Sequence, residues 1–241
     1  MAQKARRTGL VWAIVGAVVL VVGAVAIVVA VIGAGPAPSP TRGSATTSSA
    51  SASLPTSDGS VVDRSVTGRG WIPEPVTTDP KTYIVGALEA AATLDTTKSD
   101  REAWLAYLGT WFTPDTRYTS DADQQADMQA AKLELRQTVV LPESDWDSLA
   151  GEQGRVAAKV TSDVTFVSVP EDTSGDMRIG TADVILTYTR SDGSGGETSY
   201  EEHARVSVQV LCGPGSVPAP DSAQQAGDCK VVRYFTGPME P

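Results

Sequence analysis

The sequence predicts an α+β protein: an N-terminal transmembrane helix, then about three helices packed on a curved antiparallel sheet of four strands. Three observations predict this. One apolar run near the N-terminus holds no charged residue, capping motifs precede apolar stripes at helical spacing, and from residue 154 onward apolar and polar residues alternate. A period of about 3.6 residues is typical of a helix, and a period of two is typical of a strand.

The apolar segment is long enough to cross a bilayer. Residues 10–32 form a run of 23 residues without a charged side chain. At about 1.5 Å per residue, such a run spans a hydrocarbon core of about 30 Å as one helix. The alternative is a cleaved signal peptide with a cut near residues 34–37, but its apolar region is normally about 7–15 residues long. We therefore expect a retained anchor.

The charges around this run predict its orientation. Three basic residues precede it, namely Lys4, Arg6 and Arg7, and only Arg42 follows closely. Basic flanks stay on the cytoplasmic side of a membrane. We therefore expect a single-pass protein of the cell membrane, with a cytoplasmic tip at residues 1–9 and an extracytoplasmic C-terminal domain.

Composition divides the rest of the chain into a spacer and a folded domain. Residues 33–69 are rich in Ser, Thr, Pro and Gly and poor in large apolar side chains, so we expect a flexible linker there. The domain is expected at residues 70–241. Trp71 and Ile72 at its start are expected to dock on it.

Two of the three expected helices have plain start signals. Asp79-Pro80 is an N-cap followed by proline at the first helical position, and this helix is expected to run to about Leu94. Ser120 caps another helix, expected over about residues 121–136, with acidic residues in its first turn and basic ones in its last. Both helices carry an apolar face that suits packing on a sheet.

The remaining helix carries a stripe that is rich in aromatic residues. Ser99 and Glu102 form a capping box that opens it, and Pro114 ends it. Its apolar stripe is Trp104, Tyr107, Leu108, Trp111 and Phe112. Such a stripe is either a ligand platform or part of the core, and the core is the commoner case.

From residue 154 the period of the pattern changes to two. Apolar and polar residues alternate over residues 156–166, 182–188 and 204–210, and a last strand is expected at Lys230–Phe235. A Gly-rich turn at residues 191–196 joins two of the strands as a hairpin. Strands with one apolar and one polar face predict an antiparallel sheet that is covered on one face only.

Two cysteines, Cys212 and Cys229, flank a segment of pure loop composition. In an oxidising compartment a lone pair of cysteines usually forms a disulfide. We expect this bridge to close the base of a long loop between two strands. The redox-active alternative normally has closer spacing.

The sequence gives little support to an enzyme. The formal net charge of −10 disfavours binding to nucleic acid, because an acidic surface repels phosphates. The single histidine, His203, is either a general base or a solvated residue on the outward face of a strand, and its register favours the second. Cysteine–histidine clusters and nucleotide-binding fingerprints are missing from the sequence. We expect no metal, no cofactor and no catalytic residues.

The order of these segments resembles a known plan. The residues that carry the resemblance are the span at residues 10–32, the capped helix pair at residues 79–112 and the strands at residues 156–235. The plan is similar to the nuclear-transport-factor-two-like, or cystatin-like, cone of bitopic scaffold subunits from actinobacterial type IV secretion and conjugation systems. The loop between Cys212 and Cys229 departs from the general pattern of that family.

This resemblance implies a non-enzymatic assembly subunit of a cell-envelope transfer machine, which binds other subunits of the complex. Whether it also binds copies of itself is left open by the sequence. Two alternatives remain open. One is an accessory subunit of a lipid importer. The other is a small-molecule-binding or enzymatic cone domain, whose pocket between sheet and helices would be lined by aromatic residues: Trp104, Tyr107, Trp111, Phe166 and Tyr188.

Overall fold

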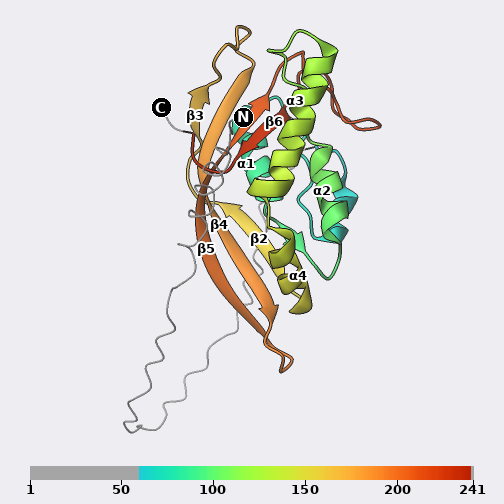
Figure 1. Cartoon of the computed structure of the whole chain (residues 1–241), viewed down its shortest axis with the longest axis vertical. Helices are drawn as coiled ribbons and strands as arrows, with labels where there is room; N and C mark the ends of the chain where they lie inside the picture. The colour runs from blue at the N-terminus through green and yellow to red at the C-terminus, as the bar shows by residue number, and fades with distance from the viewer. Residues whose placement is uncertain (1–59, 240–241) are drawn as a thin grey trace, which may run out of the picture. The chain divides into compact units, whose positions relative to one another are not determined.

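The computed structural model describes residues 60–239, which form a mixed α+β domain. In Figure 1 the helices lie along one side of a long, curled antiparallel sheet; they are α1 (Pro80–Ala90), α2 (Arg101–Gly109), α3 (Asp121–Glu134) and α4 (Glu143–Gly151). The expected cytoplasmic tip and membrane span lie outside the described residues. Among the residues that are described, no helix combines the length and apolarity needed to cross a membrane.

Residues 60–69, which composition assigned to the spacer, are ordered on the domain. Asp63 caps a short 3-10 helix, η1 (Arg64–Arg69), and the side chain of Val66 within it is buried. The backbone N–H of Val62 donates to the carbonyl of Glu74 at 2.9 Å. Trp71 is buried as expected. The structured part therefore begins before residue 70, because one buried valine and a few backbone hydrogen bonds fasten a segment of polar composition.

Helix α1 starts as expected and ends early. The Asp79 carboxylate accepts a hydrogen bond from the backbone N–H of Thr82 at 2.9 Å, and Pro80 occupies the first turn. The helix stops at Ala90, four residues before the expected end. Leu94 instead belongs to the two-residue strand β1 (Leu94–Asp95), which pairs with the sheet.

Helix α2 begins one residue later than the capping box predicts. Asp100 is its N-cap, and its carboxylate accepts from the N–H of Ala103 at 2.7 Å. The hydroxyl of Ser99 accepts instead from the indole N–H of Trp71 at 2.9 Å. The assignment of Ser99 as the cap was wrong, because a distant tryptophan uses that hydroxyl and the neighbouring carboxylate fills the capping role.

Helix α3 is capped by Ser120, as expected, and continues into a π-helical turn, η2 (Leu135–Val139). Helix α4 follows, where no helix was expected; its Trp146 and Leu149 side chains are buried. The last residues before the sheet thus form a fourth helix in the layer.

The sheet contains six strands, two more than expected. Beyond β1 they are β2 (Arg155–Val160), β3 (Thr165–Ser168), β4 (Met177–Ser191), β5 (Glu197–Leu211) and β6 (Lys230–Phe235). The order is β1-β2-β4-β5-β6, and β3 also pairs with β4. All these pairs are antiparallel, and β4 and β5 form one long hairpin around the predicted Gly-rich turn.

The helix-facing side of the sheet carries the main core. Alternate residues of β4 and β5, including Ala182, Val184, Val208 and Val210, pack with the helices. His203 lies opposite Ile185 in the middle of β5, and it is exposed.

The other side of the sheet is partly covered, which corrects the expectation of one covered face. Thr181 and Ser207 on that side are fully buried. Their hydroxyls lie 2.7 Å apart, and both bond to the backbone of Met239 near the C-terminus. Alternation assigned these polar residues to solvent. Their hydroxyl groups are instead buried, and they form hydrogen bonds with each other and with the backbone of Met239.

Candidate functional site

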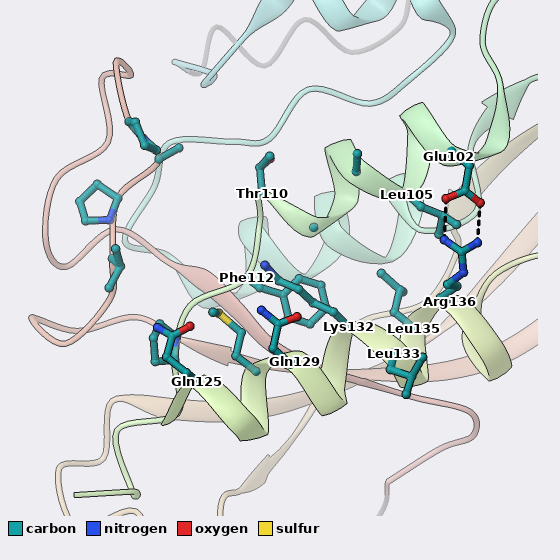
Figure 2. A pocket seen from close by; sticks show the side chains of 18 residues that line it. Glu102, Leu105, Thr110, Phe112, Gln125, Gln129, Lys132, Leu133, Leu135 and Arg136 are labelled. Atoms are coloured by element: carbon teal, nitrogen blue, oxygen red, sulfur yellow. Dashed lines mark hydrogen bonds and ion pairs between the residues drawn. The ribbon is translucent and has the colours of Figure 1, made fainter. Parts of the chain in front are cut away.

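The helix layer contains a broad groove between α2, α3 and the loop that joins β5 to β6. We call it the α2–α3 groove; its volume is about 860 Å³. Figure 2 shows its lining, which is mainly apolar with a few charged groups. The lining includes Glu102, Leu105, Ala106, Phe112, Gln125, Met128, Gln129, Lys132, Leu133, Arg136 and Val217.

The α3 wall of the groove is a second face of that helix. Ala131 points to the core and is buried, whereas Leu135, which follows α3, is buried and also lines the groove. Residues at spacings of three and four, from Gln125 to Arg136, lie on the face that lines the groove. Leu133 lies on this face with 51% of its surface exposed. A leucine outside the buried stripe of the helix is the sequence signal for this wall.

The α2 wall is shaped by small residues. Trp104 and Leu108 turn into the core and are fully buried. The opposite face presents Leu105, Ala106 and Gly109 to the groove. Because a β-carbon added at Gly109 would meet no atom within 4 Å, this wall is open.

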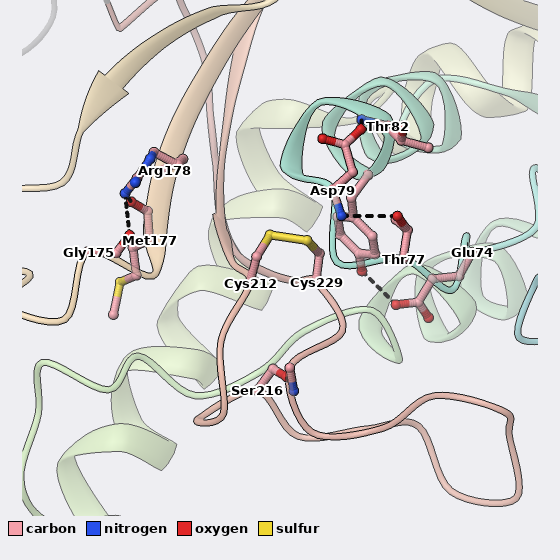
Figure 3. Close-up of a disulfide and its surroundings, with 12 residues drawn as sticks. Glu74, Thr77, Asp79, Thr82, Gly175, Met177, Arg178, Cys212, Ser216 and Cys229 are labelled. Carbon is pink, nitrogen blue, oxygen red and sulfur yellow. Dashed lines mark hydrogen bonds between the residues drawn. A yellow bond between two sulfur atoms is a disulfide. The ribbon is translucent and has the colours of Figure 1, made fainter.

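The third wall is the loop closed by the disulfide. Cys212 and Cys229 form the expected bridge, shown in Figure 3. The N–H of Val217 donates to the hydroxyl of Thr113 at 2.9 Å, which fixes the loop against the segment after α2. The Val217 side chain nevertheless stays 53% exposed. The loop thus holds an apolar residue at the edge of the groove.

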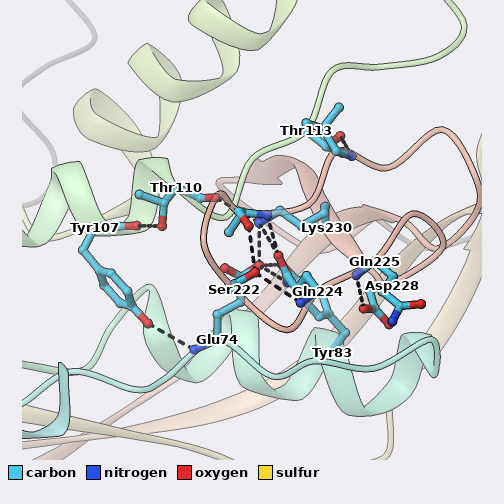
Figure 4. A network of polar contacts seen from close by, with 12 residues as sticks. Glu74, Tyr83, Tyr107, Thr110, Thr113, Ser222, Gln224, Gln225, Asp228 and Lys230 are labelled. Carbon is cyan, nitrogen blue, oxygen red and sulfur yellow. Dashed lines mark hydrogen bonds and ion pairs between the residues drawn. The ribbon is translucent and has the colours of Figure 1, made fainter. Parts of the chain in front are cut away.

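A buried polar network fastens this loop to the body (Figure 4). The ammonium of Lys230 donates to Glu74 Oε1 at 2.8 Å and to the carbonyl of Thr110 at 2.9 Å. The amide of Gln224 in the loop and the hydroxyl of Tyr83 in α1 donate to the same carboxylate oxygen, at 3.1 and 2.6 Å. Four parts of the chain therefore meet at the Glu74 carboxylate, and the segment after α2 joins them through Lys230. The Oε2 atom of Glu74 has no partner among the described residues.

Burial controls the titration of this network. Desolvation lowers the pKa of Lys230, although the Glu74 carboxylate opposes the shift. Desolvation, together with the charge of Glu74, raises the pKa of Tyr83 well above its usual value. Because carboxylate, carbonyl and amide oxygens surround the ammonium, the network is a structural fastening rather than a reactive site.

Two of the charged residues in the groove form an ion pair with each other, and the third, Lys132, forms none with a described residue. Arg136 forms a paired contact with the Glu102 carboxylate, with Nη1 and Oε2 at 2.6 Å. The ammonium of Lys132 lies 5.7 Å from the centre of the Phe112 ring. Desolvation, and secondarily the charge of Lys230, lowers the pKa of Lys132. None of the ion pairs of the described residues includes Lys132.

The five aromatic residues named as pocket candidates do not line one pocket. Trp104 and Trp111 are fully buried and belong to the core. Tyr107 stacks on Trp71, and its hydroxyl donates to the carbonyl of Ile72 at 2.7 Å.

The two candidates on the strands lie elsewhere. Tyr188 stacks on Tyr200 with ring centres 4.9 Å apart and lines a smaller hollow beside α4. Phe166 lies on β3 and is 40% exposed. The five side chains are thus spread over the core, the β4–β5 hairpin and strand β3. Alternation in a strand predicts which face of the sheet a side chain lies on, but it does not predict where along the sheet it lies.

No cluster of three or more His, Cys, Asp or Glu side chains suited to a metal ion occurs in residues 60–239. His203 does not line the α2–α3 groove.

Comparison with known proteins gives structural neighbours only. No family model matches the chain, and no curated protein matches its sequence. One similar solved structure is an IcmL-like type IV secretion system protein from Legionella pneumophila, at 11% identity and a TM-score of 0.38; the match covers 65% of this chain and 88% of that one. Another is CagV, a VirB8 homolog of the type IV secretion system of Helicobacter pylori, at 9% identity and a TM-score of 0.33, covering 62% and 89%.

Proposed function

We propose that this chain is a non-enzymatic, membrane-anchored assembly subunit of a cell-envelope transfer machine of the type IV secretion or conjugation kind. The observation that carries the proposal is the α2–α3 groove. It is open, mainly apolar and bordered by Leu133 and Val217, which face water from opposite walls. Exposed aliphatic side chains around one concave surface are typical of a site that another protein covers.

The sequence supports the anchored part of the proposal. The charge-free run at residues 10–32 and the basic tip favour a single span with the C-terminal domain outside. The disulfide between Cys212 and Cys229 fits an oxidising compartment. The order of tip, span, spacer and α+β domain is similar to the plan of bitopic assembly subunits of transfer machines.

The groove also favours binding over catalysis. Its charged lining residues are Glu102, Lys132 and Arg136, and two of these neutralise each other in an ion pair. General acid–base chemistry needs a titratable group poised to exchange a proton with a substrate. An apolar groove with a single cation better suits association with an apolar partner.

Crosslinking in membranes tests this function. The full-length tagged chain is crosslinked in the cell that produces it, extracted with detergent, purified and analysed by mass spectrometry. We expect other subunits of a transfer machine to copurify. Purification of the chain only as an isolated monomer would contradict the proposal.

Two matched variants connect the test to the groove. Ala106→Trp places a large ring in the groove, whereas Ala130→Trp adds the same ring on an exposed part of α3 that does not line it. Both sites are exposed, so the core stays intact in each. We expect the first variant to lose partners and the second to retain them.

A further inference from the structure

Lys132 is a cation of the α2–α3 groove that forms no ion pair with a described residue. Its side chain is partly buried in the α2–α3 groove, over the face of Phe112. The ion pairs of the described residues do not include it, and only desolvation and the like charge of Lys230 act on its pKa. The chain as a whole carries a formal charge of −10. The groove therefore holds a cation that the rest of the domain leaves without a carboxylate.

This cation restricts what the groove can receive. A partner that covered it with a purely apolar surface would bury an unpaired ammonium, which is strongly unfavourable. A partner that brings a carboxylate would satisfy the ammonium where water is excluded, which strengthens their attraction. Charge complementarity thus selects an apolar surface that carries one acidic group.

The shape of the groove fits a helix. Its α3 wall extends from Gln125 to Arg136, about three turns. Ala106 and Gly109 on the facing wall allow a backbone to approach closely. The amides of Gln125 and Gln129 offer polar contacts beside the apolar lining. An acidic chain is also a poor match for anionic lipid headgroups, which favours a protein over a lipid.

We propose that the α2–α3 groove receives an amphipathic helix of a partner protein, with an Asp or Glu of that helix paired to Lys132. This inference rests on the assembly role proposed above and names the class of partner segment. Apolar residues of the helix lie against Leu105, Met128 and Leu133, and its acidic side chain reaches the ammonium beside Phe112. The recognition mode is a helix in a groove, with one buried ion pair that fixes its register.

Site-directed photocrosslinking tests the proposal in the full-length chain. Photoreactive benzoylphenylalanine replaces Leu133 inside the groove, or Phe166 on the β3 edge as a matched exposed apolar site. Irradiation of intact cells is followed by mass spectrometry of the adducts. We expect the probe at position 133 to link to a segment with apolar residues at spacings of three and four and an acidic residue among them.

Charge variants then decide the role of Lys132. We expect Lys132→Glu to lower the yield of that adduct about tenfold or more, which corresponds to about 1.4 kcal/mol, and Lys132→Arg to keep it. Replacing the partner's acidic residue with Lys in the Lys132→Glu background is expected to restore the yield. A yield that Lys132→Glu leaves unchanged, or a linked segment without an acidic residue, would overturn the proposal.

Other adducts separate this proposal from the assembly role. A lipid or a second copy of this chain linked at position 133 would show that the groove takes a different occupant. Adducts with foreign subunits at position 166 and none at 133 would refute the groove helix and leave the assembly role standing. The absence of adducts at both positions would count against both.

Discussion

The ammonium of Lys230 lies 2.8 Å from Glu74 Oε1, and each side chain is only 1% exposed. The two residues are 156 positions apart in the sequence. Glu74 comes from the entry segment before α1, and Lys230 follows Cys229 at the start of β6. This ion pair joins the two ends of the domain beneath the loop that forms one wall of the groove.

Removing one partner of this pair is expected to be costly. Lys230→Met leaves the Glu74 carboxylate buried without its cation, so we expect the free energy of unfolding to fall by about 3–5 kcal/mol. The double variant Glu74→Met/Lys230→Met is expected to recover part of that loss, because no charge then remains buried. Denaturation by urea measures both.

An exposed ion pair provides the control. Arg155 and Glu197 pair across the edge of the sheet while both side chains are about half exposed. We expect Arg155→Ala to cost about 0–1 kcal/mol. Losses of similar size for Lys230→Met and Arg155→Ala would contradict the structural role of the buried pair.

The disulfide is expected to stabilise the domain without being needed for the sheet. The double variant Cys212→Ser/Cys229→Ser opens a loop with a sequence separation of 17. We expect a loss of about 2–4 kcal/mol in the free energy of unfolding, with an unchanged far-ultraviolet circular dichroism spectrum. Rapid thiol labelling of the native domain without reductant would argue against the bridge.

The two buried tryptophans are expected to be core residues. Trp104 is fully buried, stacks on Trp146 with ring centres 5.6 Å apart, and its indole N–H has no partner in the described part of the chain. We expect Trp104→Ala to cost about 3–5 kcal/mol in unfolding free energy. Phe166→Ala, at an exposed site, is expected to stay within about 0.5 kcal/mol. Equally small losses of unfolding free energy for the two variants would contradict the assignment of Trp104 to the core.

The cap of α1 predicts a specific acid dependence. Hydrogen bonds from the side chain and backbone of Thr82 lower the pKa of Asp79 from its usual 3.8. A carboxylate whose pKa is lower in the folded state stabilises above the unfolded pKa, and this contribution disappears as the pH falls through the folded pKa.

The variant Asp79→Asn isolates that effect. Asparagine keeps a good capping side chain but does not titrate. We expect wild type to be more stable than the variant by about 0.3–1 kcal/mol at pH 6, because a negative charge favours a helix N-terminus. The difference should vanish as the pH falls below 3.8 toward acid. A difference that is constant with pH would contradict the assignment.

Local patterns predicted the elements that depend on neighbours in sequence. Alternation located β4 and β5 because their apolar residues face one core, and the Asp79 and Ser120 caps marked true helix starts. Prediction failed where a distant group intervened. Ser99 was mistaken for a cap because Trp71 uses its hydroxyl.

The candidate site was less accessible to sequence reasoning. The groove exists because α2 and α3 pack at a distance that only the tertiary structure sets, and no local pattern gives that distance. The pairing of Glu74 with Lys230 has no sequence signal either, since the contact spans most of the domain. The aromatic stripe was an attractive pocket candidate, yet burial of Trp104 and Trp111 assigns both to the core.

We propose that this chain is an assembly subunit of a transfer machine and acts through its groove. The most direct test is the frequency of transfer in cells that lack the chain and carry wild type, Ala106→Trp or Ala130→Trp at equal membrane levels. We predict that transfer is lost without the chain, returns with wild type and Ala130→Trp, and stays low with Ala106→Trp. Transfer at the normal frequency in cells without the chain would contradict the account.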